Sequence, residues 1–140
     1  MKKIIFPIAL IAFITLIAFT SCKKGPGTGG RATIKGKVWT RKHDSKYNVV
    51  DSYASADEPV YIIYGEETNY GDKVNTNYNG EYEFQYLRKG NYKIYVYSDD
   101  SVKKSTATEP LLVPKMAIVQ DITIKDRKET IDAGKIVVLH

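Results

Sequence analysis

The sequence predicts an all-β protein built as an antiparallel β-sandwich. From Ala32 onward, apolar and polar residues alternate with a period of two, and no stretch of eleven residues shows the apolar stripe of a helix. The alternating positions are rich in Tyr, Val, Ile and Thr, which favour strands, and turn-forming residues separate them. Several short strands divided by turns are typical of a sandwich.

The composition indicates one folded domain. Hydrophobic residues make up 43% and charged residues 26% of the chain, which is typical of a folded domain and argues against disorder. The single cysteine excludes an intramolecular disulfide, so the hydrophobic core alone must hold the fold. Lys and Arg number 21 against 16 acids, and removing Lys2 and Lys3 with the leader described next leaves 19 against 16, a net charge of +3. This small excess does not indicate a nucleic-acid partner.

Residues 1–21 have the features of a bacterial signal peptide. Lys2 and Lys3 precede an apolar run over residues 4–19, which is shorter than the about 20 residues that a membrane-spanning helix needs. The sequence Phe19-Thr20-Ser21-Cys22 resembles the lipobox of bacterial lipoproteins, with Phe19 where Leu is usual. The resemblance implies cleavage before Cys22 and acylation of its thiol. The alternative is an uncleaved membrane anchor with an incidental cysteine.

Residues 22–31 are expected to form the lipidated cysteine and a flexible tether. The stretch from 23 to 30 contains four glycines, one proline and no apolar side chain to bury. The domain that follows, residues 32–140, should therefore lie close to a membrane of the bacterial cell envelope, facing the periplasm or the cell surface. Lys23 and Lys24 stand where some surface-exported lipoproteins carry acidic residues, which favours the periplasmic side.

Alternation predicts which residues of the strands face the core. In chain order these residues are Ala32, Ile34, Val38, Val60, Ile62, Tyr64, Tyr92, Ile94, Val96, Ile118, Ile122, Ile124, Ile136 and Val138, and the same alternation extends to His140.

The pair Asn79-Gly80 predicts a hairpin turn. A three-residue loop with Gly80 in the left-handed conformation would pair Thr76 with Tyr82 and Val74 with Phe84. We prefer this loop to a two-residue turn, because a slip of one residue would turn one face of the strand toward solvent.

Three stretches resemble the transthyretin-like domains, which include the carboxypeptidase regulatory-like and Cna-B-type modules. They are a Pro-led strand at residues 58–62, a Thr-Asp-x-x-Gly-x-Tyr turn within residues 74–84, and a Leu-x-x-Gly-x-Tyr corner within residues 87–96. Asn77 replaces the Asp of the turn, which still suits a turn. The resemblance covers residues 34–96 and implies a seven-stranded, immunoglobulin-like (prealbumin-like) sandwich. It also implies that the Tyr92 hydroxyl bonds a backbone group upstream, and it says little about activity.

The sequence contains no recognisable catalytic motif. It lacks a Gly-x-Ser-x-Gly elbow, a His-Glu-x-x-His pair and a phosphate-binding glycine loop. The consecutive His43, Asp44 and Ser45 cannot converge as a triad does. We therefore expect no catalytic residues. A hydrolase would have to use His43 or His140, the two histidines of the chain.

Two groups of oxygen ligands resemble calcium sites only in part. Asn75, Asn77 and Asn79 have the spacing of a calcium loop, but they are neutral amides and Tyr86 stands where the loop requires Glu. The acids at positions 51, 57 and 58 could meet near one end of the sandwich, although carboxylates beside turns are usually solvated. We expect no metal and no other cofactor.

Cna-B-type modules often carry an internal isopeptide bond from a Lys on the first strand to an Asn on the last. Lys35 and Lys37 could donate here, but residues 134–140 contain neither Asn nor Asp, and Asp132 lies just before them. We therefore expect no such bond.

The segment from Thr40 to Glu58 is long for a sandwich loop. It is either a recognition loop or an extra short strand around Tyr47 to Tyr53 with two ordinary turns. The sequence leaves both interpretations open.

Four side chains are predicted to form an exposed patch. If Val60, Ile62, Ile94 and Val96 face the core, the alternate residues point outward, and in transthyretin-like folds these two strands are neighbours. Cross-strand aromatic pairs stabilise a sheet, but such a patch also suits a partner protein or a sugar ring. The residues of the patch are Tyr61, Ile63, Tyr95 and Tyr97.

These observations predict a non-enzymatic, lipid-anchored β-sandwich of the cell envelope that acts as an interaction or structural accessory module, with the four-residue patch and the segment from Thr40 to Glu58 as its contact surface. The expected partners are the membrane, through lipid on Cys22, and a protein or polysaccharide of the envelope. The alternative is a carbohydrate-binding accessory module, and a weaker one is an envelope hydrolase.

Overall fold

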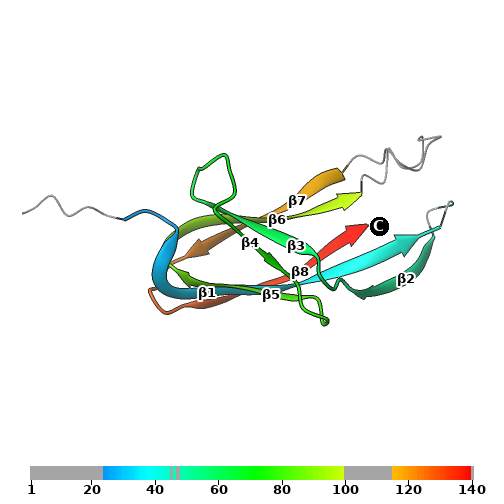
Figure 1. Ribbon diagram of the computed structural model, residues 1–140, viewed down its shortest axis with the longest axis horizontal. Helices are drawn as coiled ribbons and strands as arrows, with labels where there is room; N and C mark the ends of the chain where they lie inside the picture. The colour runs from blue at the N-terminus through cyan, green and yellow to red at the C-terminus, as the bar shows by residue number, and fades with distance from the viewer. Residues whose placement is uncertain (1–23, 45, 47, 100–114, 140) are drawn as a thin grey trace, which may run out of the picture.

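The structure, a computed structural model, describes residues 24–44, 46, 48–99 and 115–139. Within them, eight strands form two four-stranded sheets, which confirms the all-β prediction (Figure 1). The strands are β1 Thr28–His43, β2 Val49–Ala54, β3 Pro59–Tyr64, β4 Asp72–Asn75, β5 Glu81–Leu87, β6 Gly90–Asp99, β7 Lys115–Ile124 and β8 Thr130–Leu139. The expected signal peptide, Cys22 and His140 lie outside the described residues. No helix in the described residues has the length and hydropathy needed to span a bilayer.

The long strand β1 organises the first sheet. It pairs with β8 in parallel from Thr33 to Arg41. Its other edge pairs antiparallel with β5 along its first half and with β2 along its second half. The second sheet has the order β4-β3-β6-β7 and is antiparallel throughout.

The core lies between the two sheets. Val60, Ile62, Ile94 and Val96 are fully buried, as alternation predicts. The rings of Tyr82 and Phe84 meet edge to face from the first sheet. The remaining buried apolar residues are Ala32, Ile34, Val38, Leu87, Tyr92, Ile124, Ile136 and Val138.

The expectation of seven antiparallel strands is wrong in two respects. Residues 49–54, within the long segment from Thr40 to Glu58, form β2, so the structure has an eighth strand and supports the extra-strand interpretation. β8 runs parallel to β1. Period-two alternation shows which face of a strand is buried, but it does not show which strand lies beside it.

The predicted hairpin at Asn79-Gly80 is also wrong. Val74 pairs with Val60 of β3, whereas Phe84 pairs with Ile34 of β1, so the chain crosses from one sheet to the other at this turn. The Asn77 side-chain oxygen accepts hydrogen bonds from the backbone N–H groups of residues 79 and 81, both at 2.9 Å, and closes the turn without a strand ladder. The left-handed Gly80, with φ +72°, is confirmed.

The segment expected to be a tether is partly built into the fold. β1 begins at Thr28, four residues before the expected boundary at Ala32, so residues 28–31 belong to the sandwich. The Tyr92 hydroxyl donates a hydrogen bond to the carbonyl oxygen of Arg88 at 2.6 Å, which confirms the predicted tyrosine corner. The same hydroxyl accepts a hydrogen bond from the backbone N–H of Gly27 at 3.0 Å. The corner therefore holds the N-terminal segment as well as its own turn.

Candidate functional site

The predicted patch lies on the outer face of the second sheet. β3 and β6 are hydrogen-bonded neighbours, and Tyr61 is the direct cross-strand partner of Tyr95. Directly opposed residues of an antiparallel pair share one face of the sheet. Tyr97 follows Tyr95 by two residues on the same face. The structure therefore brings these three predicted tyrosines together.

A fourth tyrosine joins them from the loop between β3 and β4. The rings of Tyr61 and Tyr95 stack with centroids 4.9 Å apart and planes at 10°. Tyr97 meets both edge-on, at 5.7 and 5.6 Å. Tyr70 contacts Tyr61 at 5.2 Å and 67°. We call these four residues, Tyr61, Tyr70, Tyr95 and Tyr97, the tyrosine surface.

The four tyrosines divide into two kinds by exposure. Tyr61 and Tyr95 are half-buried, because each covers one ring face of the other. Tyr70 and Tyr97 keep 55% and 39% of their surface exposed, and neither is stacked face to face on another ring within the described residues. The stacked pair therefore stabilises the sheet, and the two exposed rings are the ones that a ligand would reach first.

The predicted Ile63 lies at the margin of the tyrosine surface. Its cross-strand partner is Lys93, whose Nζ lies 3.5 Å from a carboxylate oxygen of Glu66. On the other side, Val119 of β7 pairs with Tyr95, is 52% exposed and extends the apolar area. Alternation along β7 could have placed Val119 outward. The position of Tyr70 could not be foreseen, because it depends on the path of the loop after Gly65.

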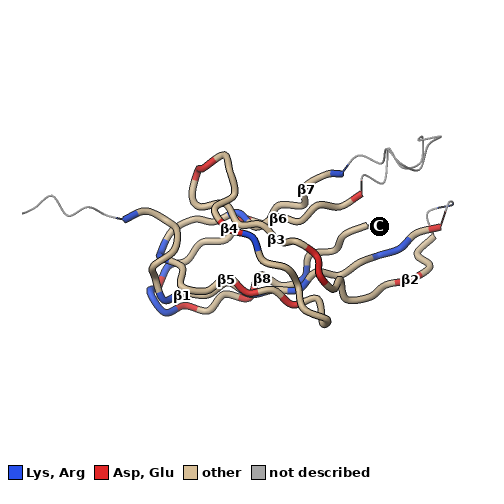
Figure 2. Tube along the Cα trace, in the orientation of Figure 1, with Lys and Arg blue, Asp and Glu red and all other residues tan. Residues whose placement is uncertain are grey.

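The tyrosine surface consists of phenol side chains and contains no Lys, Arg, Asp or Glu. Burial, followed by the neighbouring phenol of Tyr97, raises the pKa of Tyr95, so its hydroxyl stays protonated well above neutrality. The nearest charges come from the adjoining strands: Lys73 is the partner of Tyr61, and Asp121 is the partner of Lys93. In Figure 2 the trace of β3 is accordingly free of charged residues.

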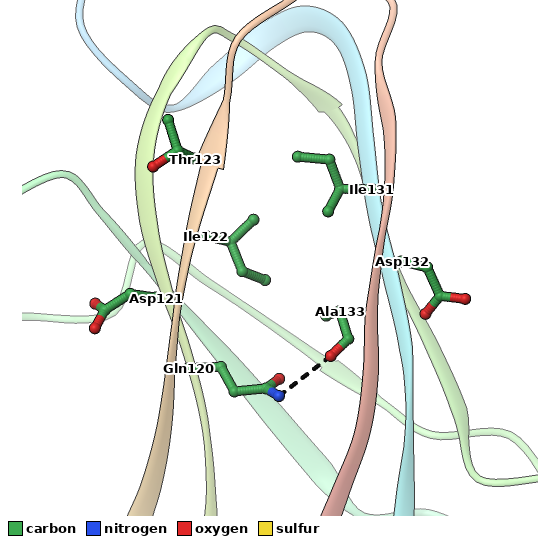
Figure 3. A pocket seen from close by; sticks show the side chains of 7 residues that line it. All are labelled: Gln120, Asp121, Ile122, Thr123, Ile131, Asp132 and Ala133. Carbon is green, nitrogen blue, oxygen red and sulfur yellow. Dashed lines mark hydrogen bonds between the residues drawn. The ribbon is translucent and has the colours of Figure 1, made fainter.

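A cavity of about 370 Å³ lies between β7 and β8, two edge strands that do not pair with each other (Figure 3). The Gln120 side-chain nitrogen donates to the carbonyl oxygen of Ala133 at 3.1 Å and bridges the gap. Ile122 and Ile131 point toward each other, whereas the side chains of Asp121 and Asp132 point away. The cavity therefore lacks a converging pair of titratable groups.

A second cavity of about 560 Å³ lies beside Gly36 and Tyr82. A Cβ atom on Gly36 would approach the Tyr82 hydroxyl to 2.5 Å, so glycine makes room for the ring. Burial raises the pKa of Tyr82 far above its usual value, which keeps the phenol neutral.

The remaining candidate residues of the sequence take part in turns, side-chain hydrogen bonds and cross-strand pairs. Asp44 accepts hydrogen bonds from the backbone N–H groups of residues 46 and 48, so its carboxylate closes a turn and does not orient His43. The Asn75 amide donates to Asp57. Lys35 and Asp132 are cross-strand partners on the exposed outer side of the first sheet. Among the described residues, no three His, Cys, Asp or Glu side chains form a group that could hold a metal.

No protein-family model and no curated protein matches this chain. Among solved structures, one similar chain is a Pseudomonas aeruginosa protein proposed to bind carbohydrate; the two are 11% identical over 81% of this chain and 91% of that one, with a TM-score of 0.47. Another is (S)-allantoin synthase, at 12% identity over 92% of this chain and 46% of that one, with a TM-score of 0.39. At these identities and TM-scores, neither similarity carries a functional argument.

Proposed function

We propose that this chain is a non-enzymatic binding module of the bacterial cell envelope, held at a membrane by lipid on Cys22, and that the tyrosine surface is its contact site. We also propose that it is a lipoprotein related to the transthyretin-like domains, on the motifs at residues 58–62, 74–84 and 87–96. In this proposal the protein brings a partner to the membrane and leaves it chemically unchanged.

The observation that carries the proposal is the gathering of four tyrosines on the outer face of the second sheet. Tyrosine combines a large apolar ring with a polar tip, and it is enriched where proteins meet their partners. A cross-strand pair alone would stabilise the sheet. Tyr70, however, comes from a loop, and both it and Tyr97 remain exposed, so neither is needed to fill the core.

Attachment to a membrane would allow a weak contact at the tyrosine surface to form. A protein confined to a membrane meets partners in the same envelope at a raised effective concentration, so modest affinity suffices. The leading candidate for the partner is an envelope protein, because the tyrosine surface is flanked by both signs of charge in Lys73, Lys93 and Asp121.

A polysaccharide is the second candidate. Pyranose rings present apolar C–H faces that pack on aromatic rings, and Tyr70 and Tyr97 have ring surface available. If this candidate is right, Tyr70 and Tyr97 bind the sugar. The stacked pair of Tyr61 and Tyr95 holds these two rings in place through edge-on ring contacts.

The two candidates are tested with one pair of variants. Tyr70→Ala combined with Tyr97→Ala removes the exposed rings, and Tyr53→Ala combined with Tyr78→Ala removes two exposed tyrosines elsewhere as a matched control. We expect the first variant to lose retention on insoluble envelope polysaccharide, or photo-crosslinking to one defined envelope protein, by about tenfold or more, since a central aromatic contact contributes about 2 kcal/mol. Equal behaviour of the two variants in both assays would reject the tyrosine surface as the contact site.

The anchor is tested separately. Labelled palmitate should enter the wild-type chain, and Cys22→Ala should abolish both the label and recovery of the protein in the membrane fraction. A labelled Cys22→Ala chain would reject acylation at this residue.

A further inference from the structure

One end of the sandwich receives the N-terminal segment and holds it in place. Gly27 is buried, and its carbonyl oxygen accepts a hydrogen bond from the backbone N–H of Arg88 at 2.9 Å. Its own N–H bonds the Tyr92 hydroxyl, as described above. The Pro26 ring packs so closely on Gly90 that a Cβ there would lie 2.5 Å from it. The chain is therefore attached to the turn between β5 and β6 from Pro26 onward.

The attachment leaves little chain between the proposed anchor and the sandwich. Cys22 precedes Gly25 by three residues, which span at most about 11 Å when fully extended. The carbonyl oxygen of Gly25 already accepts a hydrogen bond from the Arg88 side chain at 3.4 Å. A lipid on Cys22 would therefore bring this end of the sandwich against the headgroups, where a ten-residue flexible tether would have let the domain turn freely.

Basic residues gather at this same end. The turn between β7 and β8 lies beside the turn between β5 and β6, because Gly90 at the start of β6 pairs with Ile124 at the end of β7. Figure 2 shows blue segments along the incoming chain and around this end. We call the following residues the basic end: Lys24, Arg31, Arg88, Lys89, Lys125, Arg127 and Lys128.

The acidic residues near the basic end are fewer. They are Asp126, Glu129, and Glu66 and Glu67 in the loop after β3. The Glu129 carboxylate accepts hydrogen bonds from the backbone N–H groups of residues 125 and 126, and Glu66 lies 3.5 Å from Lys93. The excess charge at this end is therefore positive.

We infer that the basic end is a docking surface for the anionic headgroups of the membrane that holds the lipid on Cys22, and that it sets the orientation of the whole sandwich. The inference rests on the lipid anchor of the proposed function. The strands run away from this end along the long axis of the molecule (Figure 1), so they stand away from the bilayer. The tyrosine surface, on the side of the sandwich, then remains open to partners.

Each basic residue near an anionic surface raises affinity about fivefold. Charge reversal at three residues of the basic end should therefore weaken the electrostatic contact about 100-fold or more. The test variant is Lys89→Glu with Lys125→Glu and Lys128→Glu. The matched control is Arg41→Glu with Lys42→Glu and Lys46→Glu, which reverses three charges at the opposite end.

The experiment uses the acylated chain, purified from bacterial membranes and reconstituted into vesicles of phosphatidylcholine, with or without phosphatidylglycerol. Because Cys22 is the one cysteine of the chain and is blocked by lipid, an added cysteine carries a fluorescent label at one place. Thr130→Cys reports on the basic end and Val50→Cys on the far end. Lipid carrying a headgroup spin label quenches whichever probe lies near the bilayer.

We expect strong quenching at residue 130 and weak quenching at residue 50 on anionic vesicles. The difference should fall in the test variant, in high salt and on phosphatidylcholine alone, and persist in the control. Equal quenching at the two positions, or equal effects of test and control variants, would overturn the inference. Mass spectrometry of the purified chain reports acylation separately. If the chain is not acylated, the proposed anchor is wrong, and sedimentation of the same variants with anionic vesicles then decides whether the basic end binds lipid.

Discussion

The two outer faces of the sandwich are built on the same backbone pattern but differ in composition: charged residues dominate the first sheet, whereas a cluster of tyrosines flanked by charges lies on the second. The outer face of the first sheet is a charged lattice, in which Lys37 lies 2.9 Å from Glu81 and Lys35 is flanked by Glu83 and Asp132. We call the following residues the charged face: Lys35, Lys37, Glu81, Glu83, Asp132 and Lys135. At corresponding outward positions the second sheet carries the tyrosine surface.

The difference separates the positions that folding constrains from those that it leaves free to vary. Inward residues of both sheets are aliphatic or aromatic, because both sheets must close over one core. Outward positions need only suit water, and the charged face does so with pairs such as Lys37–Glu81 and Lys35–Asp132 on neighbouring strands. Stabilisation of the sheet accounts for the stacked rings of Tyr61 and Tyr95, whereas the exposed rings of Tyr70 and Tyr97 are the ones that the proposed binding role would explain.

The largest expected effect tests whether the inward sides of the two sheets are equivalent. Ile34→Ala in β1 and Ile94→Ala in β6 each empty a fully buried site, and each should lower the free energy of unfolding by about 2–5 kcal/mol, measured by urea denaturation. The milder Ile→Val change at either position should cost about 0.5–1.5 kcal/mol. A negligible cost for one of the alanine variants would show that its sheet does not share the core.

Sequence reasoning found the core and most of the candidate site for one physical reason. Strict alternation assigns each residue to a face, so Val60, Ile62, Ile94 and Val96 were predicted inward, and the tyrosines beside them outward. Alternation carries no information on neighbours. Only the structure could therefore establish that β8 pairs in parallel with β1 and that the chain crosses between the sheets after β4.

The sequence prediction of the tyrosine surface lacks Tyr70 for a related reason. Tyr70 joins the tyrosine surface through a loop, and loop paths follow tertiary contacts such as the hydrogen bond from the backbone N–H of Gly71 to the Ile62 carbonyl. The attachment of Gly27 to Tyr92 was missed because a glycine-rich stretch has the same composition whether it is free or docked.

The next largest effect concerns the turn at Gly80, where the chain crosses from β4 in the second sheet to β5 in the first. Gly80 has φ +72°, and a Cβ there would lie 2.4 Å from the Val38 carbonyl oxygen. Gly80→Ala should therefore lower the free energy of unfolding by about 1–3 kcal/mol, measured by thermal and urea denaturation. Gly134 also has a positive φ, but no atom lies within 4 Å of its Cβ position, so Gly134→Ala serves as a control for backbone strain alone. Equal losses at the two glycines would show that the close contact at Gly80 adds nothing.

A smaller effect separates the stacked pair from the exposed pair of the tyrosine surface. A double-mutant cycle on Tyr61→Ala and Tyr95→Ala should give a coupling free energy of about 0.5–1.5 kcal/mol in unfolding experiments, because the two rings stack at 4.9 Å. The same cycle on Tyr53 and Tyr78, for which no ring contact is found within the described part of the chain, should give none. A cycle without coupling at Tyr61 and Tyr95 would mean that their stacking contributes nothing to stability.

The smallest effect is a difference in pH dependence between the two faces. A hydrogen bond from Lys37, followed by one from Asn77, lowers the pKa of Glu81 in the folded state. The stability that this carboxylate contributes is therefore present above its unfolded value near 4.5 and is lost as the pH falls through the lower folded value. Tyr95 behaves in the opposite sense: its pKa is raised, so its contribution is present below the unfolded value near 10 and is lost as the pH rises through the folded value.

The free energy of unfolding, measured across pH, should therefore fall at acid pH less steeply in Glu81→Gln than in the wild type, and at alkaline pH less steeply in Tyr95→Phe. High salt should weaken the first effect, since the Lys37–Glu81 pair is exposed, and leave most of the second, since burial is its main cause. A salt-insensitive acid slope would show that the charged face is held by something other than its ion pairs.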